Sequence, residues 1–236
     1  MSKDTEQFTF VNSDTSKPYS LVDVGPYLPD DWRDQLLQTA VDFRRDVEVM
    51  PSSTSRHDED GPFRMGLVDG LALREAEPWI FELYHGVLKD LASLALGAQL
   101  VAAQSDEYGV ILNVLDAEKD DNYETHVDSN GATVVLGVTE HEEGGELIMS
   151  VDPEVRGYFD SLSDSAIAIP PKVGQAVIFD GTDKPHYVQL PSSGTRVTAV
   201  FNYYTSQAPE QDRPAELSHA IGLDSEVGKK GMLWHK

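Results

Sequence analysis

The sequence contains no cysteine and few basic residues. Without cysteine the chain of 236 residues can form no disulfide, no thiolate metal site and no cysteine nucleophile. Any metal site must therefore use histidine, aspartate or glutamate side chains. Only 18 residues are lysine or arginine against 41 aspartate or glutamate, which gives a formal net charge of −23. Because such a surface repels phosphate groups, we expect no nucleic-acid partner.

Long hydrophobic runs are also absent. No uninterrupted apolar stretch is long enough to cross a bilayer, so we expect no membrane association. The first residues, MSKDTEQFTF, lack a basic segment followed by an apolar core, and they do not indicate a secretory signal. We therefore expect a cytoplasmic protein. Hydrophobic residues make up 40% of the chain, which is ordinary for a globular protein of one domain. Homodimerisation is left open.

The N-terminal part of the chain shows helical periodicity in two places. Apolar residues at helical spacing predict a first helix over residues 29–43, which starts at acidic residues that suit the positive end of a helix dipole. A second helix is predicted over residues 78–96, with Gly97 as its C-terminal stop. Residues 51–70, between them, are charged and turn-rich and predict a surface loop. An edge strand is expected near residues 8–11.

After residue 105 the pattern changes to short β-rich runs separated by turn residues. The predicted strands are 108–115, 133–139, 146–151, 166–169, 176–179, 187–190 and 197–204. Many short strands without intervening helices favour an antiparallel sandwich or jelly roll. We therefore predict a mainly β fold with flanking α-helices in a single domain, residues 1–236. Its parts are an N-terminal arm with supporting helices (1–105), a β core (106–206) and a C-terminal tail or lid (207–236).

Three residues of this β region have the right chemistry for a metal site. His126 and Asp128 stand two positions apart, so on an extended segment their side chains point to the same face. A His-x-Asp pair is common by chance, but a further histidine, His186, begins a later predicted strand. Two histidines and one carboxylate form the facial triad that holds non-haem Fe(II) and leaves coordination positions open. We call these three residues the triad.

Arg196 stands ten positions after His186. If residues 192–194 form a three-residue hairpin loop with Gly194 in the left-handed conformation, His186 lies opposite Val200. His186 and Arg196 then face the same side of the sheet, separated by roughly 13 Å at about 3.3 Å per residue. A guanidinium can form a bidentate pair with a carboxylate, so Arg196 could anchor a dicarboxylate on the metal. A surface salt bridge is the alternative for Arg196.

These residues carry a family resemblance. The triad, then Arg196, with Gly144-Gly145-Glu146-Leu147 on an intervening strand, resembles the Fe(II)/2-oxoglutarate-dependent dioxygenases, especially their prolyl-hydroxylase-like branch, over about residues 108–205. The resemblance implies a double-stranded β-helix core of the jelly-roll or cupin type. It implies that the triad binds Fe(II), that Arg196 binds the distal carboxylate of the co-substrate 2-oxoglutarate, and that O2 is the oxidant. Asn113 and Tyr123 are candidates to line the co-substrate pocket, although core packing or a turn would explain each equally well.

The expected substrate is a small molecule. The layout of the whole chain looks more loosely like small bacterial dioxygenases and halogenases that act on free amino acids. That resemblance implies a substrate-carboxylate contact for Arg64, a substrate contact for Asn202 and a lid position for Trp234, although Arg64 could equally pair with the acidic residues 58–60. Related halogenases replace the carboxylate of the triad with a small residue, so Asp128 favours hydroxylation.

We therefore predict an Fe(II)- and 2-oxoglutarate-dependent hydroxylase that acts on an unactivated C–H bond of a free amino acid or derivative. Three alternatives stay open. The first is a cupin-like metal protein without oxygenase activity, either an isomerase or a binding module. The second is a halogenase-related enzyme. The third is an interaction protein that uses its acidic surface.

Overall fold

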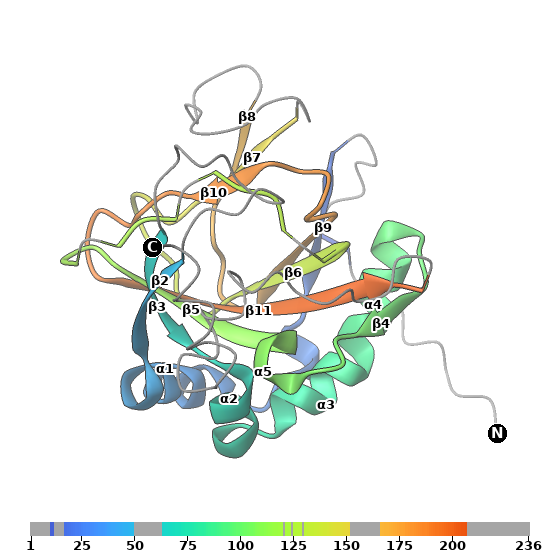
Figure 1. The fold of residues 1–236 in the computed structure, drawn as a ribbon, viewed down its shortest axis with the longest axis horizontal. Coiled ribbons are helices and arrows are strands. Elements are labelled where there is room, and N and C mark those ends of the chain that lie inside the picture. Colours follow the sequence, from blue (N-terminus) through green and yellow to red (C-terminus); the bar gives the residue numbers. More distant parts are fainter. Residues whose placement is uncertain are drawn as a thin grey trace, which may run out of the picture.

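Two antiparallel sheets face each other, and helices cover the outer side of the larger sheet (Figure 1). The computed structural model describes residues 10–11, 17–49, 63–119, 121–123, 125–128, 130–151 and 166–206. Among these residues, no helix is long and apolar enough to span a membrane.

The larger sheet contains eight strands in the order β1-β9-β6-β11-β5-β3-β2, with β4 paired to the end of β11. The bounds of these strands are β1 Tyr19–Asp23, β2 Arg45–Val49, β3 Phe63–Val68, β4 Leu100–Ala102, β5 Val110–Asp116, β6 Ala132–Gly137, β9 Gln175–Phe179 and β11 Thr195–Thr205. The smaller sheet has the order β10-β7-β8, with bounds β7 Leu147–Ser150, β8 Ala166–Ile169 and β10 His186–Val188. All strand pairs in both sheets are antiparallel.

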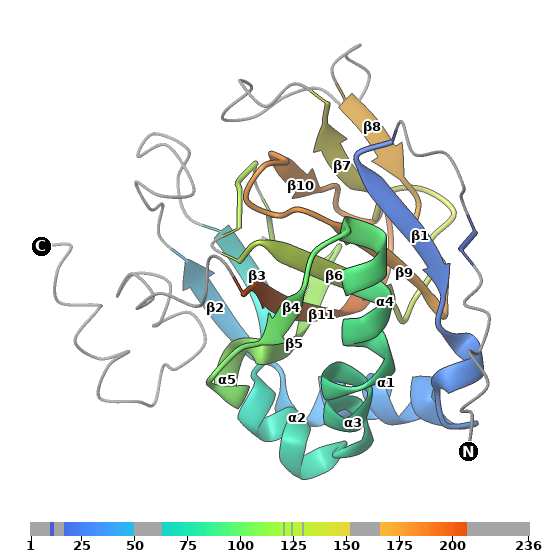
Figure 2. The ribbon, with the colours of Figure 1, turned by 90° about the vertical axis from the view of Figure 1, so that its right-hand side faces the viewer.

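The helices lie on the opposite side of the larger sheet from the smaller sheet (Figures 1 and 2). They are α1 Trp32–Phe43, α2 Gly70–Ala76, α3 Trp79–His85, α4 Val87–Leu96 and the short α5 Asp106–Gly109, with a 3-10 turn at Gly25–Tyr27. Their apolar side chains pack against the larger sheet in the main hydrophobic core. The helical layer therefore supports the sheet from behind and leaves its other face to the smaller sheet.

The side chains of β11 alternate between two hydrophobic cores, one on each face of the larger sheet. Val197, Ala199, Phe201 and Tyr203 belong to the core beneath the helices, whereas Val200 belongs to a second core between the two sheets. Because successive side chains of a strand point to opposite faces, every second residue of β11, counted from Val200, faces the space between the sheets. That space is where the functional side chains gather.

The predicted fold class is confirmed, and each of the seven predicted core strands corresponds to one of β5 to β11. The first predicted helix is confirmed as α1. The second predicted helix is two helices, because Gly86 ends α3 with its N–H donating to the carbonyl of Glu82 at 3.0 Å and with a backbone that leaves the helical region. Of the predicted edge strand, Phe10 forms an isolated bridge with Val22, and residues 8 and 9 lie outside the described part of the chain.

The prediction of a loop over residues 51–70 is wrong for its last part, where β3 joins the larger sheet between β5 and the edge strand β2. Met65 and Leu67 point into the core between the sheets, but Gly66 between them and the charged Arg64 before them obscured the alternation. A larger residue at position 66 would clash with Arg44, because its Cβ would lie 2.3 Å from Nε of that side chain. Helix α2 was also missed, although Asp69 caps it by accepting from the N–H of Ala72 at 2.9 Å.

A buried tyrosine joins the helical layer to the end of β11. The hydroxyl of Tyr84 donates to the carbonyl of Asn202 at 2.6 Å and accepts from the N–H of Ala103 at 2.7 Å, while Tyr203 donates to the carbonyl of Tyr84 at 2.8 Å. Tyr84→Phe leaves two buried backbone groups without a partner, so we expect the free energy of unfolding to fall by roughly 2–4 kcal/mol in urea denaturation. Tyr203→Phe removes one bond and should cost about 1 kcal/mol. Equal losses in the two variants would contradict this assignment.

Candidate metal and co-substrate site

The three side chains of the triad meet in space although they are distant in sequence. His126 and Asp128 lie on the segment 125–128 before β6, and His126 forms an isolated antiparallel bridge with His186 at the start of β10. Nε2 of His126 is 3.4 Å from Oδ1 of Asp128, and Nε2 of His186 is 3.8 Å from Oδ2 of Asp128. One ligand atom from each of the three lies within 4.8 Å of the others. Such a set of two nitrogens and one oxygen suits Fe(II).

The protonation states also suit a metal. Burial acts to raise the pKa of Asp128, but the charge of His186 and the contacts with His126 and Thr133 outweigh it and hold the pKa at about 2. Burial and the neighbouring His126 lower the pKa of His186 to about 4. At neutral pH, Asp128 is therefore a carboxylate and His186 a neutral imidazole, which are the forms that bind metal ions.

Neighbouring groups fix how the ligands are presented. Nδ1 of His186 is 2.7 Å from the carbonyl of Lys184, so this nitrogen carries the hydrogen and Nε2 has its lone pair free toward Asp128. The rings of Tyr123 and Phe179 pack against His126 and His186 with centroid distances of 4.9 and 4.8 Å. These contacts support both imidazole rings in the orientation in which they face Asp128.

Arg196 is the buried cation of the same interior. Its guanidinium donates from Nε to the carbonyl of Gly145 at 2.8 Å and from Nη1 to Oγ1 of Thr198 at 3.1 Å. Burial lowers its pKa to about 10, against the opposing effect of Tyr123 and Glu146, so the group stays charged at neutral pH. Within the described part of the chain no salt bridge to Arg196 is found, so this charge can accept an anionic ligand.

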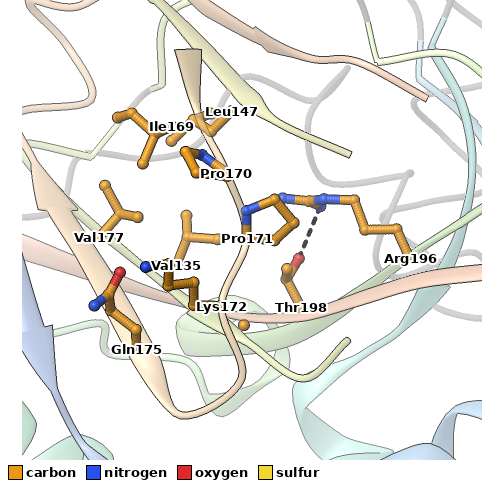
Figure 3. A pocket seen from close by; sticks show the side chains of 11 residues that line it. Val135, Leu147, Ile169, Pro170, Pro171, Lys172, Gln175, Val177, Arg196 and Thr198 are labelled. Carbon is orange, nitrogen blue, oxygen red and sulfur yellow. Dashed lines mark hydrogen bonds between the residues drawn. The ribbon is translucent and has the colours of Figure 1, made fainter. Parts of the chain in front are cut away.

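A small cavity of about 20 Å³ adjoins the Arg196 side chain. Figure 3 shows Arg196 extending into it with the hydrogen bond to Thr198, while apolar side chains such as Val135, Ile169 and Val177 form other parts of the lining. A cavity of this size holds a group about as large as one water molecule. It can therefore receive the end of an anionic ligand and not a whole dicarboxylate.

Asn113 and Tyr123 lie between Arg196 and the triad. Asn113 pairs with Thr198 across β5 and β11, and its amide nitrogen is 3.4 Å from the hydroxyl of Tyr123. Its amide oxygen is buried without a partner. An orphan acceptor of this kind is costly in a folded protein unless a ligand or water satisfies it. Both residues are therefore placed where a bound co-substrate could reach them.

The hairpin that related His186 to Arg196 does not form. Gly194 does adopt a positive φ of 73°, but β10 pairs with β7 and not with β11, and the neighbours of β11 are β4, β5 and β6. The two residues belong to different sheets. They face the same interior because the sheets face each other, and the predicted opposition of His186 to Val200 is wrong.

The three predicted substrate residues have different locations. Asn202 lies on the interior face of β11, paired with Thr133, and its amide donates to the carbonyl of Tyr108 at 2.7 Å. Arg64 lies on the other face of β3 from Met65, and its Nε contacts Glu48 at 3.3 Å. The structure therefore does not bring Arg64 to the triad. Trp234 lies outside the described residues.

Sequence reasoning missed two threonines of the site. Thr198 accepts a hydrogen bond from the guanidinium of Arg196, and Thr133 donates a hydrogen bond to Oδ2 of Asp128. Thr198 could have been found, because it follows Arg196 by two positions on a predicted strand and so shares its face. Nothing in the sequence indicates that Thr133 turns toward Asp128, since the segment 125–128 is not a regular strand.

Comparisons with known proteins agree with this geometry. A family model described as the 2OG-Fe(II) oxygenase superfamily matches residues 111–204. No curated protein sequence matches the chain.

Solved structures share the fold at low sequence identity. A 2OG-Fe(II) oxygenase family protein from Burkholderia pseudomallei is 12% identical, with 84% of this chain and 89% of that chain covered and a TM-score of 0.58. The epimerase SnoN from nogalamycin biosynthesis, solved with Fe3+ and alpha-ketoglutarate, is 13% identical over 89% of this chain and 88% of that one, with a TM-score of 0.59. A prolyl hydroxylase from Trichoplax adhaerens, solved with a peptide fragment, is 11% identical over 80% and 84%, with a TM-score of 0.51.

The matched region begins in β5, ends in β11 and contains the triad and Arg196. Members of this family are oxidoreductases that use Fe(II), 2-oxoglutarate and O2. Residues 111–204 of the chain therefore match the 2OG-Fe(II) oxygenase superfamily, and the shared fold and the cluster of two histidines and one aspartate agree with that match.

Proposed function

We propose that this protein is an oxygenase that hydroxylates an unactivated C–H bond of a small molecule, and that the substrate is a free amino acid or a derivative of one. His126, Asp128 and His186 would hold Fe(II), and Arg196 would hold the distal carboxylate of 2-oxoglutarate. The observation that carries the proposal is the triad itself, with its carboxylate present and ionised beside a neutral imidazole. Because Asp128 would occupy its ligand position on the iron, a halide could not bind there as it does in the halogenases that lack this carboxylate.

Arg196 supports the co-substrate assignment. A buried guanidinium with only neutral hydrogen-bond partners among the described residues is costly to maintain. A carboxylate bound to its remaining N–H groups would offset that cost through charge-assisted hydrogen bonds. Asn113, with its unpartnered amide oxygen, and Tyr123 would line the path from Arg196 toward the triad.

When bound, Fe(II) and 2-oxoglutarate supply the oxidising power, and the keto acid is converted with O2 into succinate and CO2 while the substrate gains one oxygen atom. The protein would position the substrate and the ligands and would exclude water from the site. The second core, which includes Met149, Phe179 and Val188, surrounds the histidines with apolar side chains and limits water. The Asp128 side chain is 17% exposed against 5% for His126 and 4% for His186, so the site opens on the side of the carboxylate.

An amino-acid substrate is favoured by the layout of the chain, which looks like small bacterial enzymes of that class, and by Asn202. The Asn202 amide lies beside Thr133 on the interior face of β11, where a polar group could contact a substrate over the triad. The relatives vary in their chemistry, because one is an epimerase and another a prolyl hydroxylase. The reaction outcome therefore has to be read from the product.

The proposed activity can be measured directly. With Fe(II), ascorbate and 2-oxoglutarate under air, we expect at least one member of an amino-acid panel to stimulate succinate formation, and the product to gain one oxygen atom by mass spectrometry. An isomer of unchanged mass would indicate epimerisation, and a product lighter by a pair of hydrogens would indicate ring closure or desaturation. No stimulated succinate from any compound, together with no 2-oxoglutarate binding, would count against the oxygenase.

Asp128→Ala removes the carboxylate ligand. We expect bound iron and hydroxylation to fall by roughly 100-fold or more, because two histidines alone hold Fe(II) weakly. Iron content after anaerobic purification and succinate formation measure the effect. Chloride transfer by the unmodified protein would show that the hydroxylase assignment is wrong.

Variants of Arg196 separate co-substrate binding from iron binding. Arg196→Gln removes the charge and the fork-like donor geometry, at a cost of roughly 1.5–3 kcal/mol, so we expect the KM for 2-oxoglutarate to rise roughly 10–100-fold. Arg196→Lys keeps the charge and should recover only part of the loss. Iron content should stay the same in both variants. An unchanged KM in Arg196→Gln would show that the co-substrate is anchored elsewhere.

A further inference from the structure

Asn130, Thr133 and the carboxylate of Asp128 are connected by consecutive hydrogen bonds. Its hydroxyl contacts Oδ2 of Asp128, and Nδ2 of Asn130 lies 2.9 Å from the same hydroxyl oxygen. Nδ2 of Asn130 is also 2.8 Å from the carbonyl of Ala132. Thr133 and Asn130 are both only 3% exposed. Water therefore competes little with these contacts.

The carbonyl of Ala132 determines the direction of both hydrogen bonds in this series. The carbonyl of Ala132 can only accept, so the atom of Asn130 that faces it is the amide nitrogen. The second hydrogen of that nitrogen points to the hydroxyl oxygen of Thr133, which accepts it. The single proton of Thr133 is then left for Oδ2 of Asp128. Asn130 thus orients Thr133, and Thr133 donates to one chosen oxygen of the carboxylate.

The carboxylate cannot easily turn away from this contact. A Cβ at Gly181 would stand 2.4 Å from Oδ2 of Asp128 and 2.5 Å from Oγ1 of Thr133, so the chain passes close against both. The backbone N–H of Asp128 also donates to the carbonyl of Gly181 at 2.9 Å. Thr133 itself is fixed in the centre of the larger sheet, paired with Phe179 and Asn202.

We propose that the Asn130–Thr133 pair is a positioning device that makes Asp128 bind iron through Oδ1 alone. The inference rests on the proposed function. A carboxylate that binds through one oxygen leaves room on the iron for both ends of a chelating keto acid and for O2, whereas binding through both oxygens would take the position that O2 needs. By occupying Oδ2, Thr133 disfavours the second mode. It also restricts rotation of Asp128, which favours metal binding.

The experiment compares Thr133→Val with Thr133→Ser in the full chain. Valine keeps the shape but has no donor, whereas serine keeps the hydroxyl. The readouts are the dissociation constant for Fe(II), measured without oxygen by chelator competition, and the visible charge-transfer band of the anaerobic Fe(II)–2-oxoglutarate complex. We expect Thr133→Val to bind Fe(II) roughly 10–100-fold more weakly, with an altered band, because outer-sphere partners of metal ligands contribute effects of that size. Thr133→Ser should resemble the unmodified protein in both readouts.

The chain offers a matched control in Thr39, whose buried hydroxyl donates to a carboxylate oxygen of Glu77 at 2.9 Å in the helical layer. Thr39→Val removes the same kind of contact at the same 3% exposure, far from the triad, and should leave iron affinity and the band unchanged. If Thr133→Val matches the unmodified protein in both readouts, or if Thr39→Val weakens iron binding as much, the inference is wrong.

A second variant covers the case in which Thr133→Val does not fold. Asn130→Ala keeps the threonine hydroxyl but no longer orients it, and we expect roughly 10-fold weaker Fe(II) binding. Unchanged affinity in Asn130→Ala would overturn the inference. If the unmodified protein binds neither Fe(II) nor 2-oxoglutarate, the proposed function fails. If it binds both and these variants do so equally well, only the role of Thr133 fails.

Discussion

Strand β11 has to satisfy two environments at once, and the site depends on that constraint. One face contributes Val197, Ala199, Phe201 and Tyr203 to the core beneath the helices. The other carries Arg196, Thr198, Val200 and Asn202 into the space between the sheets. Because the strand pairs with β5 on one side and β6 on the other, a slip of one residue would expose the charged face to the helices and the apolar face to the site. The buried packing under the helices therefore fixes the register that places Arg196.

The interior also has a division of charge. The carboxylate of Asp128 and the neutral imidazole of His186 lie at one end. The guanidinium of Arg196 lies toward the other end, with Asn113 and Tyr123 between. The protein as a whole is strongly acidic, with a formal net charge of −23, yet the cation of the site is buried and is shielded from that surface. An anionic ligand is therefore attracted by a local group and not by the overall field, which would repel it.

Much of this arrangement could be predicted from the sequence, because it depends on short-range patterns. The alternation of β5 to β11, the i and i+2 spacing of His126 and Asp128, and the helical periodicity of α1 are local signals. What could not be predicted depends on pairing between distant segments. The partner of β10 is β7, which no local pattern indicates, and β3 was hidden because Gly66 serves to admit the Arg44 side chain. Thr133 belongs to the same class, since its role arises from a segment without regular structure that returns to the sheet.

The bridge between His126 and His186 has a consequence for stability. Each residue donates its backbone N–H to the carbonyl of the other at 2.9 Å, and these contacts join segments that are far apart along the chain. A metal ion held by both side chains would close the same long loop a second time. Closing a long loop removes conformational freedom from the unfolded chain, which is how a disulfide stabilises a protein. In a chain without cysteine, the metal would thus act as the covalent cross-link that the sequence does not supply.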